Sequence, residues 1–319
     1  MQTPGIHHVS SIAAHPQRNL DFYGPLLGLR PVKLTVNFDL PETYHLYYGD
    51  LAGSPGTILT MFPWPNARRG RPGAGQIAAT GFAIAPESLG YWRDRLRGQG
   101  VGIEVEGPTR RFDEEVLRFT DHDGLVNELV AREGTRPTQS WESGPVPPEH
   151  AIAGFSGVTL HSRQPEATAR VLTELLGFEP AGEEAGRQRF VADRQALGAV
   201  VDLAPAPDVS GTEGTGTVHH VAFRARDDAE QAEWRERVAA AGLEVTPVRD
   251  RQYFRSIYFR EPGGVLFEIA TDQPGFATDE TVEQLGSHLK LPPWLETRRP
   301  AIERGLLPIT LPSGARIPA

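Results

Sequence analysis

The chain of 319 residues contains no cysteine, which excludes disulfide bonds, thiolate metal sites and cysteine nucleophiles. It also has no apolar run approaching the roughly 20 residues that a membrane-spanning helix needs. The opening residues Met1–Pro4 lack the basic region and the apolar stretch of a secretory signal. We therefore expect a cytoplasmic protein that does not associate with a membrane.

The sequence is also poor in clustered positive charge. Its formal net charge is -9, and no basic segment is long enough to follow a phosphate backbone, so we expect no nucleic-acid partner. Hydrophobic residues make up 39% and charged residues 23% of the chain, which is typical of a globular protein. The composition is compatible with a homo-oligomer but does not indicate an oligomeric state.

Internal repetition is the most informative feature of what is present. The segment Tyr91–Val101 resembles Glu233–Leu243 in its tryptophan, both arginines, the following aliphatic residue and the final glycine. The apolar residues in both segments have helical spacing, and the glycines, Gly100 and Gly242, stand where a helix ends in a left-handed residue.

A second pair of helices is repeated in the same way. The segment Leu26–Pro31 resembles Leu175–Pro180, and each contains a glycine, Gly28 or Gly177, at the predicted helix end. The first and third helices are thus alike, as are the second and fourth. The chain therefore resembles a duplication of a unit that itself contains two modules.

Each module is predicted to contain one strand, one helix and three further strands. In the first module, a strand at His7 precedes a helix near Asn19–Leu27 and strands at Pro31–Asn37, Tyr44–Gly49 and Thr57–Phe62. The other modules span about 76–132, 151–204 and 216–271. A sheet of this kind leaves one apolar face to cover, so paired modules can curl into a half-open barrel with a ligand pocket on its concave side.

A segment rich in Pro, Gly and Ser at 134–150 cannot continue a sheet. We therefore predict an N-terminal domain at 1–133, a linker at 134–150, a C-terminal domain at 151–274 and a proline-punctuated tail at 275–319 that packs against the body. The predicted fold is α+β, with four βαβββ modules paired into two half-open barrel domains.

Twin histidine pairs, His7-His8 and His219-His220, open the first strands of modules one and four. Superposing the modules identifies residues that share a place in the repeat. At the first-strand position, modules one to four contain His8, Gly81, Gly157 and His220. At the last-strand position they contain Thr60, Glu128, Asp202 or a neighbour, and Glu268.

Modules one and four alone can supply two histidines and a carboxylate, namely His8, His220 and Glu268. A single strand histidine is more often an ordinary core or surface residue, but its recurrence at equivalent positions favours a metal site. Because Glu128 has no histidine partner, we interpret it as structural. Two imidazoles and one carboxylate leave coordination positions open, which suits Fe(II) that must bind substrate and O₂, while Mn(II) accepts the same ligands.

These residues and repeats resemble those of a known protein family. The βαβββ repeats with ligands on strands resemble the vicinal oxygen chelate superfamily, which includes glyoxalases, bleomycin-resistance proteins and extradiol dioxygenases. The likeness covers essentially the whole chain and is closer to the hydroquinone-type ring-cleaving dioxygenases. It is carried by Ile6-His7-His8, Tyr44-His45-Leu46-Tyr47-Tyr48, Gly53–Thr57 with Phe62-Pro63, Pro262-Gly263-Gly264, and Pro292-Pro293-Trp294.

The resemblance implies that His8, His220 and Glu268 are the Fe(II) ligands, as the repeats also indicate. It further implies that Arg251 and Tyr258 are substrate-side groups. It also assigns a supporting role to His7 and His219. In a regular strand these two side chains face away from the metal, so a bulge or a twist is needed to bring them in.

Ser10 is added from strand alternation alone, since it lies two residues from His8 and shares its face. The resulting hypothesis is an Fe(II)-dependent dioxygenase that cleaves the ring of a hydroquinone- or catechol-type aromatic with O₂. Two alternatives stay open. One is a glyoxalase-like isomerase or lyase, which normally needs a fourth protein ligand where Thr60 stands, and the other is a metal-free binding protein of the same fold.

Overall fold

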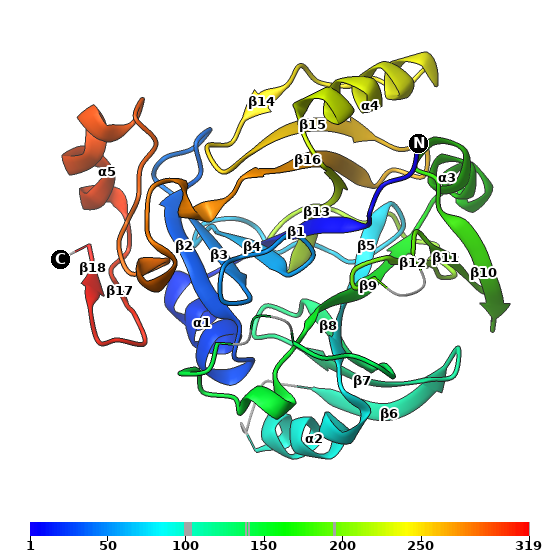
Figure 1. Ribbon diagram of the computed structural model, residues 1–319, viewed down its shortest axis with the longest axis horizontal. Helices are drawn as coiled ribbons and strands as arrows, with labels where there is room; N and C mark the ends of the chain where they lie inside the picture. Colours follow the sequence, from blue (N-terminus) through cyan, green and yellow to red (C-terminus); the bar gives the residue numbers. More distant parts are fainter. Residues whose placement is uncertain (99–103, 138, 140, 194–195, 319) are drawn as a thin grey trace.

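Two large curved sheets form the body of the molecule (Figure 1). The computed structural model describes residues 1–98, 104–137, 139, 141–193 and 196–318. Each large sheet has eight strands, and a small two-stranded sheet lies near the C-terminus. The predicted α+β fold with four βαβββ modules in two curled sheets is confirmed.

The first sheet combines modules one and four. Its strands, in spatial order, are β14 (Arg249–Asp250), β15 (Phe254–Arg260), β16 (Leu266–Pro274), β13 (Thr217–Ala225), β1 (Ile6–Ala13), β4 (Ile58–Pro63), β3 (Tyr44–Gly49) and β2 (Arg30–Val36). Strands β1 and β13 meet at the centre in antiparallel pairing, and each also pairs in parallel with the last strand of its own module.

The second sheet combines modules two and three in the same order. Its strands are β10 (Glu179–Glu184), β11 (Arg187–Val191), β12 (Val200–Leu203), β9 (Gly154–His161), β5 (Gln76–Ile84), β8 (Val126–Ala131), β7 (Glu114–Thr120) and β6 (Val105–Arg111). Each sheet therefore takes one module from each half of the chain. The division into domains at 1–133 and 151–274 stays a prediction, but it does not coincide with the division between the sheets.

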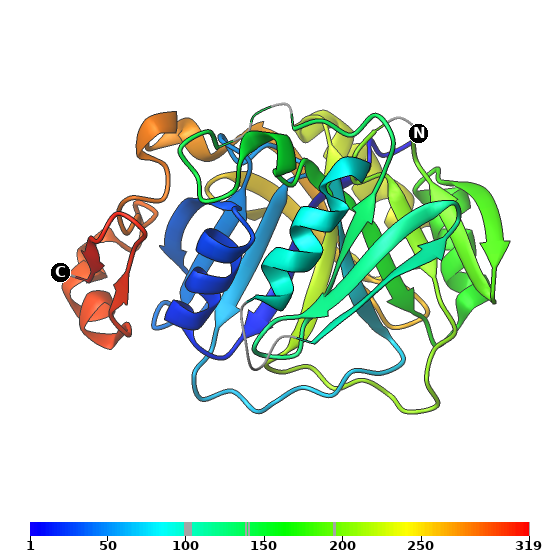
Figure 2. The ribbon, with the colours of Figure 1, turned by 90° about the horizontal axis from the view of Figure 1, so that it is seen from below.

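The helices of each module lie on the outside of the sheets (Figure 2). They are α1 (Pro16–Asp21) with the π-helix η1 (Phe22–Leu26), the 3-10 helix η2 (Pro86–Ser88) with α2 (Leu89–Arg97), α3 (Pro165–Arg170) with the π-helix η4 (Val171–Leu175), and α4 (Asp228–Ala240). The predicted likeness between alternate helices extends to this detail, because the first and third helices both continue into a five-residue π-helix.

The predicted glycine helix ends are confirmed where the chain is described. Gly28, Gly177 and Gly242 have φ angles of 70°, 79° and 77°, the left-handed region in which a residue without Cβ is favoured. Gly100, the fourth predicted helix end, lies outside the described residues.

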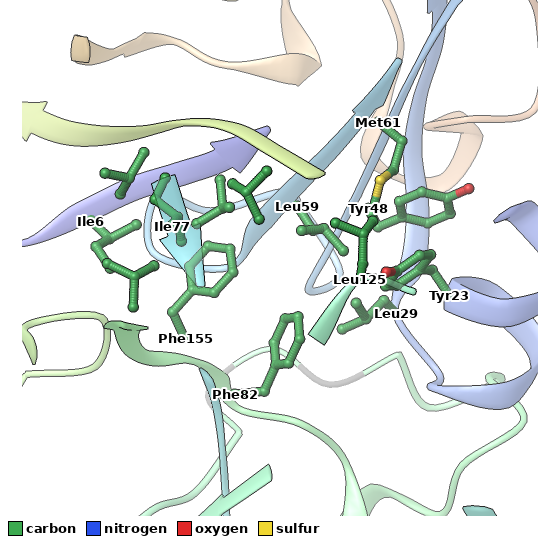
Figure 3. Close-up of a cluster of buried hydrophobic side chains, with 14 of the residues drawn as sticks. Ile6, Tyr23, Leu29, Tyr48, Leu59, Met61, Ile77, Phe82, Leu125 and Phe155 are labelled. Atoms are coloured by element: carbon green, nitrogen blue, oxygen red, sulfur yellow. The ribbon is translucent and has the colours of Figure 1, made fainter. Parts of the chain in front are cut away.

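A shared apolar core joins the two sheets. Residues from β1, β4, β5 and β9 contribute to it, including Ile6, Leu59, Phe82 and Phe155, which are at most 1% exposed (Figure 3). Two long connections, 64–75 and 204–216, also run together and form isolated bridges at the end of the sheets (Figure 2). The sheets are thus fixed relative to each other by core packing and by paired loops.

The described part of 134–150 contains no strand, only the 3-10 turn η3 (Pro148–His150). After β16 the tail packs against the body, as predicted, and its contacts there include β2. Lys33, whose side chain is fully buried, forms ion pairs with Asp279, at 2.6 Å, and with Glu280. The elements of the tail are η5 (Phe276–Thr278), η6 (Val282–Gln284), η7 (Glu296–Arg298), α5 (Arg299–Gly305), β17 (Ile309–Thr310) and β18 (Arg316–Ile317).

Among the described residues, no helix is both long enough and apolar enough to span a bilayer.

Candidate metal centre and its cavity

His8, His220 and Glu268 converge at the centre of the first sheet. The Nε2 atoms of His8 and His220 are 3.2 Å apart. They lie 3.3 and 2.8 Å, respectively, from Oε2 of Glu268. All three side chains are buried, and they form the one cluster of this kind among the described residues that could hold a metal ion. The sequence predicted this convergence from residues up to 260 positions apart.

The geometry of these atoms fits a metal ion. Two ligands in neighbouring positions around a metal at about 2.1 Å stand about 3 Å apart, which matches the separations observed here. The Oε2 atom of Glu268 is buried and makes no hydrogen bond of acceptable geometry, despite the two nearby nitrogens. A buried carboxylate oxygen without a hydrogen bond is costly unless a cation binds there.

The charge state of the cluster also favours a cation. Burial alone would raise the pKa of Glu268, but the proximity of His8 and His220 holds it well below its usual range. Ser256 donates a hydrogen bond of 2.5 Å to Oε1 and fixes the carboxylate from the other side. Burial also lowers the pKa of His220. An ionised carboxylate is the form in which Glu268 can bind a metal.

Both central strands carry a bulge at the first histidine of the pair. Between β1 and β13, the pairing passes from Ile6 to His8 while the partner strand advances by one residue, so His7 is the extra residue. On β13, His219 is extra in the same manner. The bulges that the sequence required are therefore present, and each one changes the alternation of side chains beside a ligand.

The two bulge histidines contact the two candidate ligand histidines. Nδ1 of His7 lies 2.9 Å from Nδ1 of His8, and Nδ1 of His219 lies 2.6 Å from Nδ1 of His220. Burial, reinforced by the neighbouring histidine, lowers the pKa of His7 well below its usual range and that of His219 to about 4. His219 also lines the cavity described below, whereas His7 is buried behind it, against Phe254.

A cavity of about 280 Å³ opens directly onto the cluster. Its polar lining includes His8, Ser10, His45, Tyr47, Asn37, Asp39, His219, His220, Arg251 and Tyr258. Its apolar walls are Phe38, Leu40, Phe62, Trp64 and Phe254. A cavity that combines aromatic walls with convergent polar groups is suited to a flat aromatic ligand with polar substituents.

Arg251 and Tyr258 lie together on one wall. Arg251 Nε is 3.2 Å from the Tyr258 hydroxyl, and Arg251 Nη1 is 3.0 Å from Oδ2 of Asp39. Burial, followed by the charge of Glu268, raises the pKa of Tyr258, so its hydroxyl stays protonated. Since Arg251 donates to that oxygen, the Tyr258 proton is free to be donated into the cavity.

Ser10 also lies where strand alternation placed it. It pairs with His220 on one side and with Thr60 on the other, and its Oγ is 2.7 Å from Oγ1 of Thr60. Tyr47 stands opposite Thr60 on β3, so one row of side chains crosses the sheet to the candidate ligand His220. All eight predicted site residues are therefore at the cluster or beside it.

The sequence did not single out Asp39, His45 or Tyr47 as site residues. His45 and Tyr47 are two positions apart on β3, so strand alternation places both side chains on the same face of the sheet as Thr60. This alternation could have identified them as site residues. Asp39 stands on the loop between β2 and β3, and nothing in its sequence context indicated that this loop reaches Arg251.

The second sheet provides an internal comparison. Glu128 pairs with Gly81 as Glu268 pairs with Ala222, so the equivalent of His220 is Ala79, two residues earlier. The alignment of Gly81 with His220 was therefore wrong, because apolar strand residues alone did not fix the register. The pairing also identifies Asp202 as the equivalent of Thr60. Asp202 pairs with Thr159, two residues after Gly157, just as Thr60 pairs with Ser10, two residues after His8.

Glu128 is structural in the second sheet, as predicted. Its two oxygens accept hydrogen bonds of 3.1 and 2.7 Å from Arg111. Burial would raise the pKa of Glu128, but Arg111 lowers it. The same strand position therefore holds a carboxylate that faces two histidines in one sheet and a carboxylate that is ion-paired with an arginine in the other.

Comparison with known proteins agrees with this architecture. The model of the glyoxalase/bleomycin resistance protein/dioxygenase superfamily matches residues 5–129 and again 154–269. The chain belongs to this superfamily. The two matches span the four modules and leave out most of the linker and the tail.

Relatives cover nearly the full length. A Bacillus subtilis protein, named as the ring-cleaving dioxygenase MhqO, is 49% identical over 96% of this chain and 97% of its own length. The chlorohydroquinone/hydroquinone 1,2-dioxygenase of Sphingobium indicum is 35% identical over 93% of this chain and 95% of its own.

Solved structures agree as well. A crystal structure named for a dioxygenase of Bacillus subtilis has a TM-score of 0.93 at 47% identity, covering 97% of this chain and 98% of that chain. Glyoxalase I of Zea mays has a TM-score of 0.61 at 16% identity, covering 84% of this chain and 92% of that chain, which shows a shared fold.

Proposed function

We propose that this superfamily member is an Fe(II)-dependent dioxygenase that uses O₂ to cleave the ring of a dihydroxylated aromatic of the hydroquinone type. The observation that carries the proposal is the open cluster of His8, His220 and Glu268 at the floor of an aromatic-walled cavity. Two relatives that match over nearly their full length support the same reaction class, one named as a ring-cleaving dioxygenase and the other as a chlorohydroquinone/hydroquinone 1,2-dioxygenase.

The donor set defines how a metal would be held. Nε2 of His8, Nε2 of His220 and Oε2 of Glu268 would be the ligands, which is the facial arrangement typical of non-haem Fe(II) oxygenases. Bound there, Fe(II) would supply a site at which a phenolic oxygen becomes more acidic and O₂ can accept electrons from the ring. Mn(II) would accept the same ligands.

The surrounding residues have separate roles in this proposal. If Nε2 of each ligand histidine binds the metal, its Nδ1 carries the proton. Nδ1 of His8 then donates a hydrogen bond to Nδ1 of His7, and Nδ1 of His220 donates one to Nδ1 of His219. These hydrogen bonds fix the tautomer and the ring orientation. Tyr258 donates its proton toward a substrate oxygen, and Arg251 stabilises negative charge that develops there.

Two alternatives make different demands on the cluster. A glyoxalase-like isomerase or lyase would want a fourth protein ligand, but the Thr60 hydroxyl at that corner is already bonded to Ser10 and His45. A metal-free binding protein would not need a buried carboxylate oxygen without a hydrogen bond facing two imidazoles.

The test is oxygen uptake by protein loaded anaerobically with Fe(II), using a panel of hydroquinones and catechols and mass analysis of the products. We expect uptake with hydroquinones and a product that gains two oxygen atoms. Absence of uptake with every member of the panel would reject the dioxygenase. Iron below about a tenth of an equivalent after loading would favour the metal-free alternative. The cytoplasmic location stays a prediction.

A further inference from the structure

A continuous chain of hydrogen bonds runs along the cavity wall beside the metal ligands. The Tyr47 hydroxyl is 2.9 Å from Nδ1 of His45, and Nε2 of His45 is 3.0 Å from Oγ1 of Thr60. Thr60 in turn lies 2.7 Å from Oγ of Ser10. Ser10, His45 and Tyr47 all line the cavity, so both ends of this relay chain, Tyr47–His45–Thr60–Ser10, reach it.

The imidazole of His45 is held rigidly in the middle. Its ring lies between Tyr47 and Phe62, with centroid separations of 4.0 and 4.3 Å and interplanar angles of 35° and 33°. These aromatic faces leave the two ring nitrogens directed at the two hydroxyls. Both nitrogens are therefore satisfied, one as a donor and one as an acceptor.

The surroundings keep His45 neutral. Burial lowers its pKa well below the usual range, and nearby His8, Arg251 and His220 lower it further, against the opposing charge of Glu268. A neutral imidazole has two tautomers. Because hydroxyls can both donate and accept, the whole chain has two arrangements of hydrogens that satisfy the same contacts.

The two arrangements differ at the Ser10 end. When His45 carries its proton on Nδ1, Ser10 donates to Thr60 and presents a lone pair to the cavity. When His45 carries it on Nε2, Thr60 donates to Ser10, which then presents its own proton. We propose that the relay chain transfers a proton between these arrangements when a substrate hydroxyl ionises. This inference rests on the proposed function.

The proton transfer balances without any change of net charge in the chain. The substrate hydroxyl gives its proton to Ser10, Ser10 passes its own to Thr60, and Thr60 passes its own to Nε2 of His45. His45 gives its Nδ1 proton to Tyr47, whose original proton leaves to water in the cavity. Ser10 then donates a hydrogen bond to the newly formed phenolate. No oxidant or reductant takes part.

Thr60, which holds in module one the position that Glu268 holds in module four, explains why such a chain lies beside the ligand cluster. Thr60 and Glu268 hold the same last-strand position in modules one and four, and Ser10 pairs with His220 across the sheet. A hydroxyl is a poor metal ligand at this position, but it is well suited to exchange protons with a molecule bound at the neighbouring open positions. His45 is therefore a positioning residue that acts through Thr60 and Ser10.

The first test measures ionisation without turnover. Stopped-flow absorbance under anaerobic conditions follows deprotonation of nitrohydroquinone by Fe(II)-loaded protein. His45→Gln retains one donor and one acceptor but has no tautomers, and Thr60→Val interrupts the chain. We expect both to slow ionisation by about 10²-fold with little change in affinity, whereas Thr60→Ser restores the rate that Thr60→Val loses.

The matched control is Thr35→Val. Thr35 stands opposite His45 on β2, and its buried hydroxyl has no hydrogen-bond partner, so the rate should not change. Wild-type ionisation rates in both His45→Gln and Thr60→Val, with Fe(II) content intact, would overturn the proposal.

A second readout separates this inference from the proposed function. ¹⁵N NMR of the metal-free protein should show a neutral His45 imidazole exchanging between two tautomers, and both ring nitrogens should lose this averaging in Thr60→Val, because one tautomer then dominates. A charged ring or a single fixed tautomer would overturn the relay, whatever the catalytic result. Failure of wild-type protein to bind nitrohydroquinone, with tautomer exchange intact, would instead count against the proposed function.

Discussion

Nε2 of His8 lies 3.2 Å from Nε2 of His220, although 212 residues separate them in the chain. The contact exists because β1 and β13 pair antiparallel at the centre of a sheet that joins the first and last modules. The bulges at His7 and His219 then place a further imidazole behind each of these residues. One pair of central strands thus supplies four histidines to the site.

Glu268 and Glu128 hold equivalent strand positions, so the same substitution should have different consequences. Glu268→Gln removes the ligand charge, and we expect iron below about a tenth of an equivalent with the fold retained. Glu128→Gln should leave iron binding unchanged but lower the free energy of unfolding by about 3 kcal/mol, since Arg111 loses a buried partner. Metal analysis and urea denaturation check both results. Full iron binding by Glu268→Gln would contradict the ligand assignment.

His7→Ala and His219→Ala should each weaken Fe(II) binding by about 10- to 100-fold, because each removes the group that orients a ligand imidazole. Competition with a chelator measures the affinity. His161, a half-buried strand histidine of the second sheet that lines its own pocket, gives the control variant His161→Ala. Equal affinity in all three variants would reject a supporting role for the bulge histidines.

Tyr258→Phe and Arg251→Gln should lower kcat by about 10²-fold or more while the iron content stays constant. The reason is that Tyr258 donates to a substrate oxygen only while Arg251 occupies the other side of its hydroxyl. Asp39→Asn, which disturbs only the outer contact of Arg251, should have a smaller effect. Steady-state kinetics on one hydroquinone decides this, and a larger loss in Asp39→Asn than in Tyr258→Phe would refute the order.

Stability should depend on pH through Asp121, which is buried in the connection between β7 and β8. Burial raises its pKa to about 6 from 3.8. Because the folded state then holds the proton more tightly than the unfolded chain, the free energy of unfolding should fall as pH rises from about 4 to 6. The contribution from this group is up to about 3 kcal/mol, at 1.36 kcal/mol per pKa unit.

The measurement is urea denaturation across this pH range, with Asp121→Asn as the comparison. The variant should lose this part of the slope. An identical pH dependence in both proteins would show that Asp121 does not titrate in the folded state as its burial implies.

The sequence by itself determined the modules, the helix ends and the three candidate ligands. Repeated segments report local structure directly, since a glycine such as Gly177 ends a helix through its own backbone freedom. The pairing of His8 and His220 with Glu268 was also accessible, because only two modules contained histidine at the repeated position.

Tertiary structure decided the rest. The exchange of modules between the two sheets, the correct equivalent of His220 in module two at Ala79, and the contact of Asp39 with Arg251 all depend on strand pairing and loop paths. A one-dimensional pattern does not encode these, because strand register is set by packing between segments far apart in the chain. The hydrogen-bonded chain through His45 emerged for the same reason, since three separate strands supply its members.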